Sequence, residues 1–143
     1  MKALILVMSI LAGLSVAQAN IDCSNADQSI QYEMVGYNRG IPPRHGDTLS
    51  TERIFLDGTL ISENIQYEGL NPQRGPVVAE FDYNSKVELE NSSSRMGFRQ
   101  VYVIKLTLSN RDYSTGLVGD DAGTLAADIT DYVLCRDIFL AVP

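Results

Sequence analysis

Alternation of apolar and polar residues dominates the chain after residue 19 and predicts β-strands rather than helices. In residues 29–37, Ile30, Tyr32 and Met34 alternate with polar neighbours, a period of two that is typical of a strand with one buried face. Residues 98–108 carry an apolar residue at nearly every second position, and the opposite face is also apolar near its middle. This segment is predicted to be a central strand that anchors the core.

Turn residues divide the apolar runs into hairpins. Asp57-Gly58 separates residues 53–56 from residues 59–62, and this dipeptide is a strong signal for a tight β-turn because both residues tolerate positive φ. A helix over residues 49–56 is the competing interpretation, but Gly58 and the β-branched residues count against it. A second hairpin is predicted from residues 77–83 and 86–90, with Asn84-Ser85 at the turn.

Loops rich in glycine, proline and polar residues lie between these strands, at residues 36–47, 68–76 and 109–123. A short helical turn over residues 124–128 and a last strand within residues 130–142 complete the pattern. Six to eight short strands with little helical periodicity predict an all-β fold, a small antiparallel β-sandwich or barrel.

The N-terminus has the features of an export signal. Met1-Lys2 precedes an apolar run over residues 3–16, and Ala17-Gln18-Ala19 is a suitable cleavage site. The run is shorter than the roughly 18 to 20 apolar residues that span a bilayer. We therefore expect residues 1–19 to be removed, leaving residues 20–143 as a single β-rich domain that is periplasmic or secreted and does not insert into the membrane.

The chain contains two cysteines, Cys23 and Cys135, one near each end of the predicted domain. Export brings them to a compartment in which thiols oxidise, so a disulfide between them is predicted. Two cysteines are too few for a four-thiolate zinc site, and the chain has a single histidine. The sequence predicts neither a metal centre nor a cofactor.

The formal net charge of −7 bears on the partners that the protein can attract. A strongly acidic surface repels nucleic acid and anionic lipid headgroups, and it favours a cationic protein. Charge that only maintains solubility is the alternative. Self-association, through strands that pair across subunits, is a further expectation.

Candidate catalytic residues lack a supporting motif. His45 lies near Asp47, but no nucleophile elbow of the form G-x-S-x-G accompanies them, so we expect a solvated loop histidine. Asp120 and Asp121, with Asp128 and Asp131 further along, form the densest carboxylate group, but their spacing matches no known calcium loop. Carboxylates within residues 80–90 should face solvent, because they alternate with apolar residues. A small carboxylate-based enzyme is therefore the least favoured of three hypotheses.

Charged loops on a rigid β-scaffold are common binding surfaces. The sequence therefore favours a non-enzymatic, exported β-domain that binds another macromolecule, and an inhibitor of a cationic protein is one domain of this kind. A structural or surface-assembly component is the second hypothesis. The candidate binding residues lie in the three long loops, and they are Arg39, Arg44, His45, Arg74, Asp120 and Asp121.

Overall fold

The structure is a computed structural model, and it describes residues 19–36, 43–89, 92–94, 97–112 and 125–139. These residues form strands and connecting segments without a helix. The strands are β1 (Ala19–Ser24), β2 (Ile30–Gly36), β3 (Thr48–Leu56), β4 (Thr59–Tyr67), β5 (Val77–Glu88), β6 (Ser92–Ser94), β7 (Gly97–Asn110) and β8 (Ile129–Phe139). The all-β prediction is confirmed.

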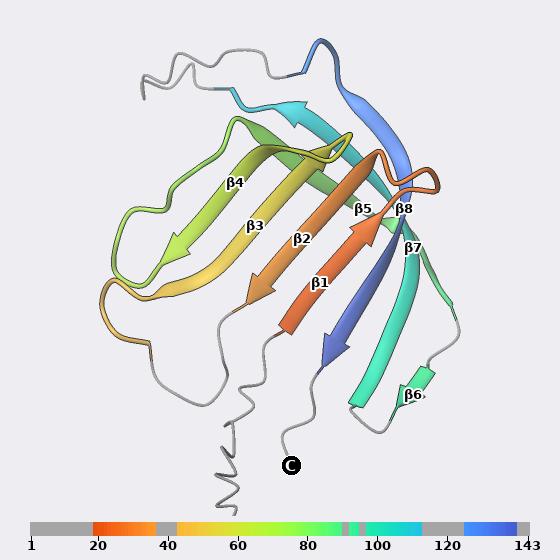
Figure 1. The fold of residues 1–143 in the computed structure, drawn as a ribbon, viewed down its shortest axis with the longest axis horizontal. Helices are drawn as coiled ribbons and strands as arrows, with labels where there is room; N and C mark the ends of the chain where they lie inside the picture. The colour runs from red at the N-terminus through yellow and green to blue at the C-terminus, as the bar shows by residue number, and fades with distance from the viewer. Residues whose placement is uncertain (1–18, 37–42, 90–91, 95–96, 113–124, 140–143) are drawn as a thin grey trace, which may run out of the picture.

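All the described strands belong to one antiparallel sheet (Figure 1), in the order β4-β3-β2-β1-β8-β7-β5. The short strand β6 pairs with β7 outside this path. Each neighbouring pair of strands is antiparallel, and no ladder joins β4 to β5, so the sheet is not closed.

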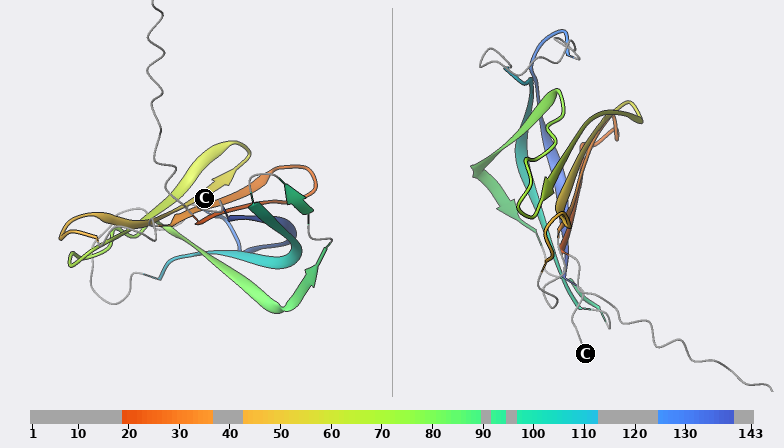
Figure 2. Two further views of the ribbon diagram at one scale, coloured as in Figure 1. Left: turned by 90° about the horizontal axis from the view of Figure 1, so that it is seen from below. Right: turned by 90° about the vertical axis from the view of Figure 1, so that its left-hand side faces the viewer.

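The sheet folds over so that the two halves of its inner face lie against each other (Figure 2). The ring of Tyr32 on β2 meets the ring of Phe81 on β5 edge to face, with 4.9 Å between their centroids, although three strands separate β2 from β5 in the sheet. The fully buried side chains lie between the two halves, and they include Cys23, Ile54, Val77, Ile104, Leu106, Leu108, Val133 and Cys135.

The predicted disulfide is present at the centre of the sheet. Cys23 on β1 lies directly opposite Cys135 on β8, with 4.0 Å between their Cα atoms, and both side chains are buried. Because 112 residues separate the two cysteines in sequence, the bond closes nearly the whole described chain into one loop.

The hairpin at Asp57-Gly58 and the long strand β7 also follow the predictions. Asp57 and Gly58 have φ values of 50° and 76°, so both take the left-handed conformation of the predicted turn, and a helix over residues 49–56 is excluded by β3. β7 has partners on both sides, β8 and β5, which confirms its predicted central place. The two strands of the hairpin are longer than predicted, since β3 begins at Thr48 and β4 ends at Tyr67.

The predicted hairpin around Asn84-Ser85 is wrong. β5 continues past this point, and both of its halves pair with the long strand β7, with a register shift between Asp82 and Val87. Ser85 holds the resulting bulge, because its hydroxyl donates to the Asp82 carbonyl and accepts the Lys105 N–H, at 2.6 and 2.9 Å. The polar residues that suggested a turn form a bulge instead, since β7 is long enough to pair on both sides of it.

Three other segments differ from the sequence-based expectations. The sequence pattern does not predict β1, which begins at Ala19, the last residue of the predicted signal. The polar segment at residues 92–94 is β6. Residues 125–127 are bends rather than a helical turn, and the side chain of Asn110 holds Leu125 through both of its backbone groups, at 2.8 and 3.0 Å.

Reduction of the disulfide should lower the stability substantially. In the loop-entropy model, a closed loop of this length contributes about 4 to 5 kcal/mol to the free energy of unfolding. Urea unfolding with and without a reductant measures the difference. The Cys23→Ala/Cys135→Ala variant should be insensitive to the reductant, and a loss of less than about 1 kcal/mol in the native protein would contradict the loop-entropy estimate.

Candidate functional site

A polar cleft lies where the inner face of β2, β3 and β4 approaches the start of β5. It has a volume of about 350 Å³, which is within the usual size of ligand sites. One wall comes from the strands β2 to β4, the other from residues 72–74, β5 and the residue that follows β7. The lining residues are Met34, Ser50, Glu52, Asn64, Ile65, Gln66, Pro72, Gln73, Arg74, Val78, Ala79 and Arg111. We call this site the polar cleft.

The polar wall arises because the residues on the inner face of β3 change from apolar to polar along the strand. The register places Ile54 opposite Tyr32, Glu52 opposite Met34, and Ser50 opposite Gly36. Ile54 is buried in the core, whereas Glu52 and Ser50 line the polar cleft. The inner face of β4 also becomes polar towards this end, because Asn64 and Gln66 are the partners of Glu52 and Ser50.

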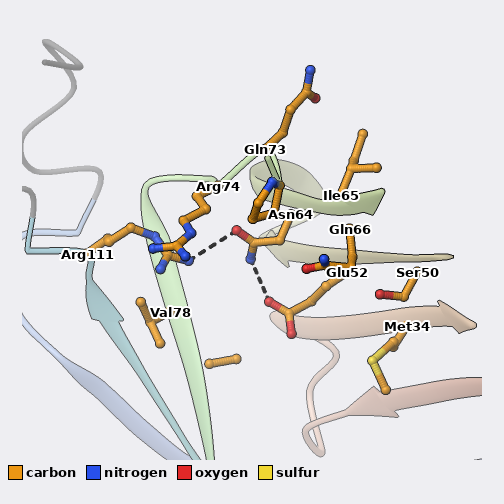
Figure 3. Close-up of a pocket in the computed structure, with 12 residues that line it drawn as sticks. Met34, Ser50, Glu52, Asn64, Ile65, Gln66, Gln73, Arg74, Val78 and Arg111 are labelled. Carbon is orange, nitrogen blue, oxygen red and sulfur yellow. Dashed lines mark hydrogen bonds between the residues drawn. The ribbon is translucent and has the colours of Figure 1, made fainter. Parts of the chain in front are cut away.

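Glu52 is held by two donors, and Figure 3 shows the bond from one of them, Asn64. The Tyr32 hydroxyl donates to one carboxylate oxygen at 2.7 Å, and the Asn64 amide donates to the other at 2.6 Å. Burial, with the negative charge of Glu52 and this hydrogen bond, raises the pKa of Tyr32 well above its ordinary value of 10.0. Tyr32 therefore stays protonated and keeps its donor role through neutral and mildly alkaline pH.

Asn64 connects this strand pair to the other wall. Its amide oxygen accepts the Gly75 N–H at 2.7 Å and the Arg111 guanidinium at 3.1 Å. Arg111 also donates from Nε to the Gly75 carbonyl, and from its backbone N–H to the Pro76 carbonyl, at 2.8 and 2.7 Å. These bonds link β2, β3 and β4 to the segment after β7, at the place where no ladder joins β4 to β5.

Ser62 makes a second connection between the two walls. The Ser62 hydroxyl donates to the Val77 carbonyl at 3.0 Å and accepts the Val77 N–H at 3.2 Å. Gly75 lies against the same place, because a Cβ there would clash with Ser62 and would lie 2.7 Å from the Glu63 backbone nitrogen. The close approach of β4 and the start of β5 thus requires glycine at position 75.

Of the predicted binding residues, Arg74 lines the polar cleft, whereas Arg44 and His45 do not. Arg44 is exposed, and its backbone N–H donates to Asp47. The ring of His45 lies against Gly69, where a Cβ would be 2.6 Å from Cδ2. Arg39, Asp120 and Asp121 lie outside the described residues, so their predicted binding role stays a prediction.

Two of the predicted loops are joined to each other. Gly46 N–H donates to the Glu68 carbonyl, and Glu68 N–H donates to the Asp47 carbonyl, both at 2.9 Å.

Within the described ranges, no group of three or more histidine, cysteine or acidic residues could hold a metal ion. Asp131 instead accepts the Asn25 amide at 3.0 Å.

Sequence reasoning missed Glu52, Asn64 and Arg111. The candidate binding residues all lie in predicted loops, whereas Glu52 and Asn64 lie on strands and Arg111 directly follows one. The available signal was the polar character of Ser50 and Glu52 on the face that carries Ile54, because an inner face that turns polar needs partners for those groups.

Comparison with protein-family models, with curated proteins and with solved structures finds no match for this chain. The part of the chain that the structure describes contains no helix that is long and apolar enough to cross a membrane.

Tyr32→Phe should lower the free energy of unfolding by about 1 to 3 kcal/mol at neutral pH, because one oxygen of Glu52 loses its donor. The pKa of Tyr32 is raised in the folded state, so its hydroxyl stabilises the protein fully at pH values below the ordinary tyrosine pKa of about 10. This contribution decreases as the pH rises above that value. The difference between the native protein and the variant should therefore shrink in strong alkali. Urea unfolding across this pH range measures it.

Tyr67→Phe is the matched control for Tyr32→Phe, since its hydroxyl has no hydrogen bond to a described residue. It should change the stability little at any pH. Equal losses in the two variants would show that the Tyr32–Glu52 bond contributes nothing specific.

Gly75→Ala should destabilise the fold by about 1 to 3 kcal/mol, since the new methyl group meets backbone that cannot rotate away. Gln73→Ala, an exposed change in the same segment, should leave the thermal midpoint nearly unchanged. Thermal unfolding of both variants tests this point, and a Gly75→Ala protein as stable as the native one would argue against the close approach of β4 and β5.

Proposed function

We propose that this chain is an exported, non-enzymatic β-domain that binds another macromolecule, and that the polar cleft is its binding site. The observation that carries the proposal is the preformed cleft itself, in which hydrogen bonds hold Glu52, Asn64 and Arg111 in place. Sites whose side chains are already ordered lose less entropy when they bind a ligand.

The state of the ionisable groups supports binding rather than catalysis. Glu52 is the one carboxylate among the described residues of the polar cleft, and both of its oxygens already accept hydrogen bonds. Each oxygen keeps a further lone pair, and hydrolysis is disfavoured because glycoside hydrolysis needs a second carboxylate on the other side of the substrate. The pKa of Tyr32 is raised, which makes its hydroxyl a poor base at neutral pH.

The edges of the sheet are less suitable for binding than the polar cleft. On β4, Ile65 already forms a bridge with Gln73, and Ser62 is bonded to Val77. The edge strand β5 carries a bulge over residues 83–86 and exposed charged residues on both sides of it. Bulges and charges are the usual means by which an edge strand avoids pairing with another chain.

Export and partner chemistry rest on the sequence. We propose that residues 1–19 are removed, and that residues 20–143 act as one domain in the periplasm or outside the cell. A disulfide is compatible with either of these oxidising locations. The net charge of −7 favours approach by a cationic protein, with an association rate that falls as salt is added.

The finer shape of the fold is also a proposal. The chain is best described as a small β-sandwich or a partly open β-barrel. The two bonds between Ser62 and Val77 favour the barrel, because they connect the strands at the two ends of the sheet order.

A structural or surface-assembly component is the second candidate function, and the outer face of the sheet favours it. Val87 on β5, Val103 on β7 and Leu134 on β8 form one cross-strand row, and Val87 is 57% exposed. Tyr132, nearby on β8, is 56% exposed. Concentration-dependent association in sedimentation experiments that is abolished by Val87→Ser would favour this function over the first.

Filling the polar cleft should abolish macromolecular binding. Gln66→Trp places a large side chain on an exposed position of the cleft wall, where a β-strand tolerates it. Thr59→Trp, exposed on the same strand but outside the cleft, is the control. The experiment compares what each immobilised protein retains from the extracytoplasmic fraction of the source organism, identified by mass.

A macromolecule that the native protein and Thr59→Trp retain, and that Gln66→Trp does not, would support the proposal. Retention of the same macromolecules by all three proteins would place binding elsewhere on the surface. Conversion of a hydrolase substrate by the purified protein would contradict the non-enzymatic role.

A further inference from the structure

The polar cleft carries an excess of positive charge in an otherwise acidic chain. Its charged lining residues are Glu52, Arg74 and Arg111, whereas the chain has a net charge of −7. Glu52 and Arg111 both bond to the amide of Asn64, so these two opposite charges belong to one network. Arg74 adds a further positive charge that this network does not offset.

The two arginines differ in how they are held. Arg111 donates to the Gly75 carbonyl and to Asn64, which fixes its guanidinium and leaves further donors, since the group has five N–H bonds. Arg74 is exposed and makes no hydrogen bond or ion pair with any residue that the structure describes. Figure 3 shows both side chains at the same end of the polar cleft, beside Asn64.

We infer that the polar cleft binds a peptide segment through a carboxylate of that peptide, which Arg74 and Arg111 receive together. The inference rests on the proposed function and names the chemistry of its ligand. A guanidinium matches a carboxylate with two parallel hydrogen bonds, so a fixed arginine and a free one form a suitable anion site. The free arginine can turn towards the ligand as it arrives.

The rest of the cleft wall fits a peptide. Ser50, Gln66 and Gln73 offer hydroxyl and amide groups, which can both donate to a carbonyl and accept from an N–H of a peptide backbone. No aromatic side chain is among the described residues of the wall, so it lacks the flat surface on which sugars and nucleobases usually stack. The wall therefore favours a peptide over an acidic sugar.

The net charge of the protein does not exclude an acidic ligand group at this place. At physiological salt, exposed charges more than about 8 Å apart are largely screened from each other. The whole surface influences the approach of a partner, whereas the nearest charges determine which group enters the cleft. A cationic protein that presents one acidic side chain or its C-terminal carboxylate satisfies both requirements.

The test uses a synthetic peptide of alternating glycine and glutamate, acetylated and amidated at its ends, and the same peptide with glutamine in place of glutamate. Calorimetry or fluorescence anisotropy measures binding to the full protein. The native protein should bind the glutamate peptide at least about tenfold more tightly than the glutamine peptide, as the loss of a charged hydrogen bond implies.

Single-residue variants test whether Arg74 binds the carboxylate of the peptide. Arg74→Gln should weaken binding of the glutamate peptide by about tenfold, and Arg74→Lys, which keeps the charge but loses the paired donors, should weaken it less. Arg44→Gln removes the same charge from an exposed position outside the polar cleft and should have no effect. Because Arg74 is exposed and without a partner in the described residues, its variants should keep the native thermal midpoint.

Four results would overturn the inference. Equal binding of the two peptides, if Gln66→Trp abolishes both, would leave the proposed binding cleft intact but remove the anion site. Absence of glutamate-peptide binding, or equal weakening by Arg44→Gln and Arg74→Gln, would reduce the arginines to a general surface charge. Preference for oligogalacturonate over the glutamate peptide, dependent on Arg74, would assign the site to acidic sugars.

Discussion

A single antiparallel sheet must shield one of its faces from water, and without a helix to cover it the sheet has to fold over on itself. In this protein the fold brings Tyr32 on β2 into contact with Phe81 on β5. The Cys23–Cys135 bond lies at the centre of the sheet, between β1 and β8, and joins the two halves covalently. The remaining difficulty lies at the two outer strands, where backbone groups of β4 and β5 approach each other without forming a ladder.

Side chains provide the hydrogen bonds that a ladder would otherwise make. Ser62 bonds to both backbone groups of Val77, and Asn64 accepts from Gly75 and Arg111. Beyond these bonds no ladder joins β4 to β5, and the polar cleft lies between the two walls. The same polar residues thus complete the fold and form the site, which is why a polar inner face is tolerated here.

Local signals in the sequence predicted the elements that depend on neighbouring residues. The Asp57-Gly58 turn needs positive φ at both positions, and β7 shows its alternation over its own length, so both were predicted correctly. The bulge at Ser85 could not be distinguished from a turn, because the difference depends on how far β7 extends beside it. Arg74 was found because it lies in a loop, whereas Glu52 and Asn64 acquire their roles from strand register and from the folding of the sheet.

The central claim is that the Asn64–Arg111 bond couples the two walls of the polar cleft. A double-mutant cycle with Asn64→Ala, Arg111→Ala and both together, measured by urea unfolding of the oxidised protein, tests it most directly. The structure predicts that the losses are not additive, with a coupling energy of about 0.5 to 3 kcal/mol, as is usual for residues in one hydrogen-bond network. Additive losses would mean that the Asn64–Arg111 bond does not couple the two walls, and would contradict this account of the site.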